Sequence, residues 1–330
     1  MAGNRYLIGA HTARGYEHFL RELAPEQGRV GVVRGPAGTG RHQLIARAAE
    51  AWEAAGRQVT RYLDPEDTGR LVAAVSGDGC ILDGAAPHQV EVPPGAMVMD
   101  LGAALDRKTM DACRQEAADL HRRIRSLRLR AGRCLRAADA AWEDAAALYA
   151  DAADAGSLYN LRLALSHWLA GTPGRGQRIF AQAVTAAGVV DCLDSLHREN
   201  RRVLRLPWGC DPHRLLSPLT AALQAAGTGF LAAMQPLNGG RLAHLCTDTH
   251  ALITEGVEEN WDLKFDQTLL QREQQALRFD RAAWELGLHQ AMEALAQARQ
   301  ARDSLERLTA DALDRERQQE MTARALRYLC

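Results

Sequence analysis

Short apolar runs and one helical spacing alternate along the N-terminal part of the chain. Residues 29–34 form a β-rich run, and residues 43–52 carry the apolar spacing of an amphipathic helix. A second strand is predicted at 58–63, and a further buried run at 79–83 ends in the acid Asp83. A strand followed by a helix and further strands is typical of an α/β core, so we expect such a core here.

Two long helical patterns follow, one in the middle of the chain and one at its end. Apolar residues recur in steps of three and four from Cys113 to Tyr149, and a similar stripe runs from Leu270 to Leu305. Each stripe is compatible with packing inside the protein and with a coiled coil that binds a partner. We expect each pattern to form a helical hairpin that projects from an α/β core.

The two parts of the chain resemble each other. Arg5–Gly15 aligns with Arg178–Gly188 at an offset of 173, sharing an Arg, two Ala, a Thr and a Gly. The Asp-Pro pair at 64–65 aligns with the pair at 211–212 at an offset of 147, which makes the second half 26 residues shorter. We therefore expect the second half to lack the glycine loop, the following helix and most of the next strand, and to have no acid at the position of Asp83.

The segment between the first strand and the first helix has the glycine spacing of a phosphate-binding P-loop. In the full motif, G-x-x-x-x-G-K-[ST], backbone N–H groups bind phosphates, the Lys reaches the terminal phosphates and the Ser or Thr hydroxyl binds Mg²⁺. The helix N-terminus adds its partial positive charge. The predicted nucleotide site consists of Gly35, Pro36, Ala37, Gly38, Thr39, Gly40, Arg41 and His42.

Two residues of this segment depart from the motif, because Arg41 stands at the Lys position and His42 at the hydroxyl position. Arginine can bind phosphate, but imidazole suits Zn²⁺ or Cu²⁺ better than Mg²⁺. We expect ATP or another nucleotide to bind, Mg²⁺ to be bound poorly, and hydrolysis to be weak or absent. Asp83 is the candidate Walker-B-like catalytic residue. The alternative is an inert glycine turn with Asp83 as a loop acid.

A second signature follows that acid. Residues 83–88 read Asp-Gly-Ala-Ala-Pro-His, and Leu101-Gly102 precedes the first long helix. Together with the paired opening segments, this pattern resembles a family of bacterial P-loop ATP-binding proteins of poorly defined function that consist of two tandem P-loop halves. The resemblance covers nearly the whole chain, and it implies P-loop folds, ATP binding and an ATPase activity.

The fold prediction is an α/β protein whose P-loop NTPase-like parallel sheet cores come from two tandem related halves, each with a long helical hairpin. The second half is the truncated one. We place the halves at residues 1–172 and 173–330, with cores at 1–102 and 173–256 and helical parts at 103–172 and 257–330.

Composition restricts the function classes. The formal charge of the 330 residues is −1 with 25% charged residues, so no overall excess of basic residues favours polyanions. The arginines at 122–136 are followed by acids and lack interleaved aromatic residues, so we expect a solvated or internally paired face and no nucleic acid partner. Seven cysteines without a C-x-x-C pair indicate reduced thiols in the cytoplasm. No segment resembles a signal peptide or a membrane span, so we expect neither export nor membrane insertion.

The remaining histidines carry weaker signals. His244, Cys246 and His250 could chelate a transition metal, but no partner pair follows, so we expect an ordinary strand and loop. His11 and His88 lie in the two signature segments and could approach the P-loop or stabilise turns.

Two hypotheses for the function remain. The first is a regulatory or sensing pseudo-NTPase that binds a nucleotide and recruits protein partners through its helical hairpins. If it is an active enzyme, it is an ATPase. The second is a structural interaction protein in which the glycine loop is inert.

Overall fold

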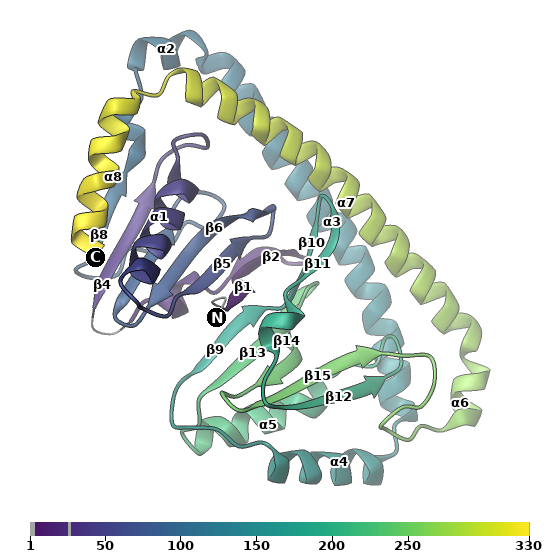
Figure 1. Ribbon diagram of the computed structural model, residues 1–330. Coiled ribbons are helices and arrows are strands. Elements are labelled where there is room, and N and C mark those ends of the chain that lie inside the picture. Colours follow the sequence, from purple (N-terminus) through teal and green to yellow (C-terminus); the bar gives the residue numbers. More distant parts are fainter. Residues whose placement is uncertain (1–3, 26–27, 330) are drawn as a thin grey trace.

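The computed structural model describes residues 4–25 and 28–329. Within these residues, eleven strands form one central sheet, and two long helices run side by side past it (Figure 1). Among the described residues, no helix combines the length and the apolar character that a membrane crossing requires.

The elements up to residue 168 form the first part of the fold. Its strands are β1 (Arg5–Leu7), β2 (Gly9–Thr12), β3 (Gly15–His18), β4 (Arg29–Arg34), β5 (Thr60–Asp64), β6 (Asp67–Ser76), β7 (Gly79–Asp83) and β8 (Met97–Asp100). Its helices are η1 (Leu20–Leu23), α1 (Arg41–Ala54), η2 (Leu101–Ala104), α2 (Arg107–Ala112), α3 (Arg114–Ala152) and α4 (Ala155–Trp168).

The elements from residue 176 onward form the second part. Its strands are β9 (Gly176–Phe180), β10 (Gln182–Thr185), β11 (Gly188–Asp191), β12 (Asn200–Leu206), β13 (Phe230–Gln235), β14 (Asn238–Cys246) and β15 (His250–Gly256). Its helices are η3 (Leu193–Leu196), α5 (His213–Ala225), α6 (Gln267–Arg272), α7 (Gln274–Asp311) and α8 (Arg315–Leu329).

The strand order of the sheet is β12-β15-β14-β13-β9-β1-β5-β6-β7-β4-β8. Counted outward from the centre, the series β9, β13, β14, β15, β12 follows the same order as the series β1, β5, β6, β7, β4. The two series meet where β1 pairs with β9 in antiparallel orientation, at Leu7 and Phe180.

The sheet is mixed, which corrects the expectation of parallel cores. β4 pairs in parallel with β7 and β8, and β1 pairs in parallel with β5. β6, which the sequence pattern missed, is antiparallel to both β5 and β7. Only Pro65 and Glu66 connect β5 to β6, and so short a loop allows only antiparallel pairing.

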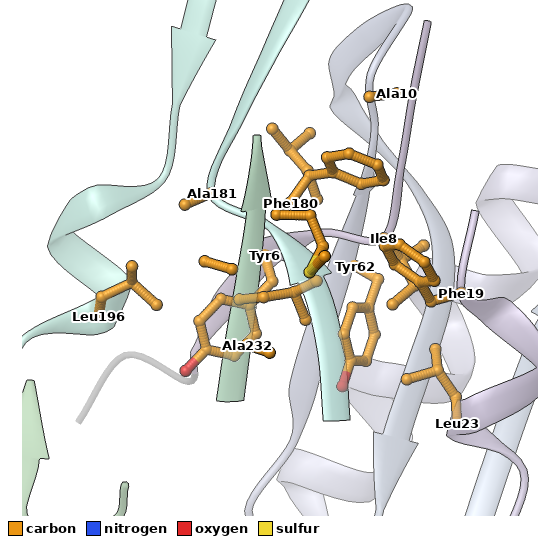
Figure 2. Packing of buried hydrophobic residues seen from close by; sticks show 14 of the residues in the cluster. Tyr6, Ile8, Ala10, Phe19, Leu23, Tyr62, Phe180, Ala181, Leu196 and Ala232 are labelled. Atoms are coloured by element: carbon orange, nitrogen blue, oxygen red, sulfur yellow. The ribbon is translucent and has the colours of Figure 1, made fainter. Parts of the chain in front are cut away.

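Apolar residues bury one face of α1 and join the two parts of the sheet. Leu44, Ile45 and Trp52 are fully buried, at most 1% exposed, and come from the face of α1 that covers β6 and β7. Figure 2 shows side chains from both parts meeting around Phe180, whose ring stacks on Phe19 with centroids 5.1 Å apart. The sheet therefore has a continuous core across the β1/β9 junction.

The expected deletion in the second half is wrong. The strand β12, the loop 207–212 and the helix α5 follow one another as β4, the loop 35–40 and α1 do. The Asp-Pro pair at 211–212 lies in that loop, before α5, whereas the pair at 64–65 follows β5. Asp-Pro recurs in unrelated turns because both residues suit turn conformations. The two pairs therefore do not occupy equivalent positions, and the alignment at an offset of 147 is incorrect.

The alignment that placed residues 230–233 at the position of 80–83 is wrong, because those residues belong to β13 and the matching strand is β15. Val33 of β4 pairs with Asp83 of β7, and Leu204 of β12 pairs with Thr254 of β15. Thr254 therefore takes the position of Asp83 in the register of the second series, and β13 corresponds by sheet position to β5.

The long helices do not form a hairpin within each half. α3 is one helix of 39 residues, and its apolar stripe packs antiparallel against α7. Ala131, Leu135 and Ala138 meet Leu288 and Ala291 in one buried cluster. Residues 114–152 contain no proline to break the helix, so α3 does not fold back on itself. Its apolar stripe is buried by α7 instead.

Each long helix leads the chain to the opposite part of the fold. α4, which follows α3, packs on α5, and α8, which follows α7, packs on α1 and β4 (Figure 1). The indole N–H of Trp52 in α1 donates to the carbonyl of Leu329 in α8 at 3.2 Å. The end of α7 and the start of α8 therefore lie beside the glycine loop, and the end of α8 lies beside the far end of α1.

Candidate functional site

The glycine loop lies between β4 and α1, as the sequence predicts. Gly35, Gly38 and Gly40 have φ angles of +135°, +91° and +86°, a region that glycine adopts without the steric penalty of a Cβ atom. The Thr39 hydroxyl donates to the carbonyl of Pro36 at 2.9 Å and stabilises the turn. The three glycines are therefore required by the backbone of this loop.

The N-terminus of α1 points its amide groups into the loop region. Its N-cap residue is Gly40, and no side chain of the described residues caps it. The first N–H groups of a helix have no partner within the helix, and the helix dipole adds partial positive charge there. This end of α1 has the chemistry of an anion-binding site.

Arg41 does not extend freely toward this site. Its Nη1 donates to Oδ1 of Asp83, and the two side chains are 8% and 1% exposed. The amide of Ala85 also donates to Oδ1, at 2.9 Å, whereas Oδ2 has no partner within the described residues. Burial raises the pKa of Asp83, and the charges of Arg41 and His42 oppose that rise. The charges of Arg41 and Asp83, which the sequence assigned to the phosphates and the metal, thus neutralise each other.

His42 is held by the sheet. Its Nδ1 lies 2.9 Å from the carbonyl oxygen of Leu71 in β6, and because a carbonyl can only accept, Nδ1 is the donor. In the second part, the Nδ1 of His213 at the start of α5 accepts from the amide of Leu242 in β14 at 3.2 Å. Both histidines thus tie the start of a helix to the neighbouring antiparallel strand.

A large cavity of about 1140 Å³ opens on one side of the loop. Gly38, Gly40 and His42 line it together with the start of β6, the end of α7 and α8. Six arginines and two acids line this cavity, namely Arg41, Arg47, Arg70, Arg299, Arg307, Arg315, Asp303 and Glu306. Its excess of basic side chains favours an anionic ligand.

A small cavity of about 130 Å³ lies on the other side of the loop. It is lined by residues 35–37, Arg41, Asp83 and His88, so the structure brings the signature at 83–88 to the glycine loop. His88 is buried, its Nδ1 lies 3.2 Å from the hydroxyl of Tyr16, and burial holds its pKa well below the ordinary value.

Other sequence candidates lie away from the loop. Nε2 of His11 lies 2.9 Å from Oε1 of Glu66. His244, Cys246 and His250 make no metal site, and no group of metal-ligating side chains occurs among the described residues. The Nδ1 of His244 accepts from the amide of Thr254 at 3.1 Å.

The arginines of α3 are partly paired, as expected. Arg122 pairs with Asp119 on the same helix. Arg128 pairs with Glu66 of the β5–β6 loop at 2.7 Å. Two of these arginines are thus paired within the chain, while Arg123, Arg125, Arg130 and Arg133 are exposed.

No sequence pattern indicated the residues that α7 and α8 bring to the loop. The Gln318 amide donates to the carbonyl of Thr39 at 3.3 Å, and Glu306 accepts from Arg70 at 2.7 Å across 236 residues of sequence. A Cβ atom on Gly38 would lie 2.6 Å from the carbonyl oxygen of Glu306. No local pattern marks these positions, because the contacts depend on the crossing of the long helices.

Comparison of this chain with protein-family models, with curated proteins and with solved structures finds no match.

Proposed function

We propose that this chain is a nucleotide-binding P-loop protein, with ATP as the best candidate ligand and with weak or absent hydrolysis. The observation that carries the proposal is the loop of residues 35–40, in which left-handed glycines lead into the uncapped start of α1 beside an arginine-lined cavity. Backbone amides and arginines at one place suit a polyphosphate.

The low hydrolysis follows from the two substituted positions. Arg41 is paired with Asp83, so neither side chain is free for the phosphates or the metal. His42 donates to the carbonyl of Leu71 and offers no oxygen to Mg²⁺. Phosphoryl transfer depends on charge neutralisation by the metal and by a cation at the terminal phosphates. The site therefore suits a sensing or regulatory role.

We further propose that the two parts of the fold are related copies of one P-loop unit. The shared strand order supports this, and so does the turn that Thr12 and Thr185 make, each by donating its hydroxyl to the glycine carbonyl three residues later. In the second copy, Gly209 has a φ of +85°, close to that of Gly38, but the remaining glycines of the frame are missing. The nucleotide site is therefore assigned to the first copy alone.

A second candidate function is a structural interaction protein with an inert loop. The contact of His213 with Leu242 favours it, because the same helix-to-strand tie occurs in a half that has no glycine frame. The Arg41–Asp83 pair satisfies the charges internally. The expected protein partner is not part of our proposal, since the apolar stripes of α3 and α7 face each other.

The cellular setting belongs to the proposal as well. The six cysteines within the described residues are free, which supports a reducing compartment such as a bacterial cytoplasm.

The test is a calorimetric titration of ATP into the wild type, Gly40→Val and Gly56→Val. Both glycines have a left-handed φ, of +86° and +76°, so both variants carry a similar backbone strain of about 1–2 kcal/mol. A side chain at position 40 blocks the close approach of phosphate to the loop and also displaces the Gln318 side chain of α8, whereas nothing lies within 4 Å of a Cβ atom at Gly56.

We expect Gly40→Val to weaken ATP binding by about tenfold or more, and Gly56→Val to bind like the wild type. A wild type that binds no nucleotide would support the structural candidate. Equal losses in both variants would show that backbone strain, and not the loop, controls binding.

A further inference from the structure

The small cavity beside Asp83 contains charged groups that the proposed nucleotide contacts do not use. It lies at the carboxyl ends of β4, β5 and β7, and the crossing helices close it. Arg128 of α3 and Arg302 of α7 both line it. These two arginines lie 174 residues apart in the sequence and meet only because α3 and α7 pack together.

Both arginines keep a buried donor without a partner. Nη1 of Arg302 donates to Glu66 at 2.6 Å and to Asp64 at 3.3 Å, but its Nη2 has no partner within the described residues. The Arg302 side chain is 10% exposed. Nη2 of Arg128 donates to Glu66 at 2.7 Å, and its Nε is likewise buried and unpartnered. A buried charged donor without an acceptor costs free energy, so these N–H groups call for an acceptor that the described residues do not supply.

The size of the cavity and the chemistry of the unpartnered arginine donors indicate the missing acceptor. A buried water needs about 10–15 Å³, so a cavity of about 130 Å³ has room for a group of several heavy atoms. Arginine N–H groups bind tetrahedral oxyanions through several hydrogen bonds at once. Asp64, Asp83 and Glu306 also line the cavity. Each accepts from an arginine, although Oδ2 of Asp83 has no partner within the described residues.

We propose that this cavity binds a tetrahedral oxyanion of phosphate size, held by Arg128 and Arg302. The group has two possible sources with the same chemistry, which are free inorganic phosphate and the terminal phosphoryl group of a nucleotide at the neighbouring glycine loop. Binding of free phosphate requires no nucleotide, so it goes beyond the proposed function. Occupation by a terminal phosphoryl group rests on that function.

The first experiment is a calorimetric titration of inorganic phosphate into the wild type, Arg128→Gln and Arg136→Gln. Arg136 is the matched control, because it lies on α3, donates to the carbonyl of Ala13 at 3.3 Å and does not line the cavity. Arg302 is a poor first choice, since its loss would leave Asp64 and Glu66 without that partner. Melting temperatures of both variants confirm that they are folded.

The second experiment compares ATP and ADP in the same variants. If free phosphate is the ligand, it binds to the wild type and to Arg136→Gln, and Arg128→Gln weakens it by about tenfold or more. If the terminal phosphoryl group occupies the cavity, Arg128→Gln weakens ATP by a similar factor without changing ADP.

Several outcomes decide between the proposals. Phosphate binding that persists in Gly40→Val while ATP binding is lost separates this site from the glycine loop. If phosphate does not bind and Arg128→Gln leaves the ratio of ATP to ADP affinity unchanged, the cavity holds water only and the inference is overturned. Phosphate binding that Arg128→Gln and Arg136→Gln weaken equally also overturns it.

Discussion

The buried pair of Arg41 and Asp83 makes a prediction about stability that can be tested without any ligand. Arg41→Met keeps much of the side-chain volume but removes the charge, leaving Asp83 buried at 1% exposure with no cation bound to it. Breaking a buried ion pair by removing one partner costs about 3–5 kcal/mol. We expect Arg41→Met to lose about that much unfolding free energy at pH 7.

The same loss should depend on pH in a definite direction. Burial already raises the pKa of Asp83, and removing Arg41 takes away the first charge that opposes this rise. The folded variant then holds the proton on Asp83 more tightly than the unfolded chain does. The loss is therefore small below the ordinary pKa of an aspartic acid and grows as pH rises, by up to about 1.4 kcal/mol per pH unit, until the raised folded pKa is passed.

The assay is urea unfolding of the wild type, Arg41→Met, Asp83→Asn and the double variant at several pH values between 4 and 8. Asparagine keeps an oxygen that can accept from the amide of Ala85. The double variant removes both charges and should recover most of the stability at pH 7. The control is Arg21→Met, whose partner Glu91 is 76% exposed, and it should change stability by less than about 1 kcal/mol.

Two results would refute this reasoning. The first is a loss below about 1 kcal/mol for Arg41→Met, which would mean that the pair is solvated. The second is a loss that is independent of pH and additive with Asp83→Asn, which would assign the effect to packing.

Two further predictions concern the metal and a buried histidine. Arg41→Lys combined with His42→Ser restores the ammonium and the hydroxyl of the full motif, so ATP affinity should become Mg²⁺-dependent in calorimetric titration. Adding Asp83→Ala should remove that dependence. A wild type that binds and hydrolyses Mg-ATP as well as the double variant would show that Arg41 and His42 form a working site. Burial lowers the pKa of His244 from 6.5 to about 4, so the folded state binds this proton less tightly than the unfolded state. The free energy of unfolding therefore decreases as pH falls from about 6.5 toward 4, by at most about 3 kcal/mol. His244→Asn, which can still accept from the amide of Thr254, should remove this part of the acid sensitivity, and an unchanged pH profile of the melting temperature would contradict the assignment.

The sequence by itself determined the local units of the fold. The run at 29–34 and the apolar spacing after it correspond to β4 and α1, and β7 occupies the predicted run at 79–83. These elements could be predicted because periodicity and the glycine spacing act over a few residues. β6 was missed, and its omission led to the expectation of a parallel sheet.

Tertiary structure alone decided which distant segments meet. The pairing of α3 with α7 depends on two apolar stripes that must bury each other, and either stripe alone is equally compatible with a hairpin or a partner helix. That pairing brings Arg302 and Glu306 beside the glycine loop. Arg41 and Asp83 are 42 residues apart. Which carboxylate pairs with a guanidinium depends on burial and on distance in space, and the order of residues in the sequence does not contain this information.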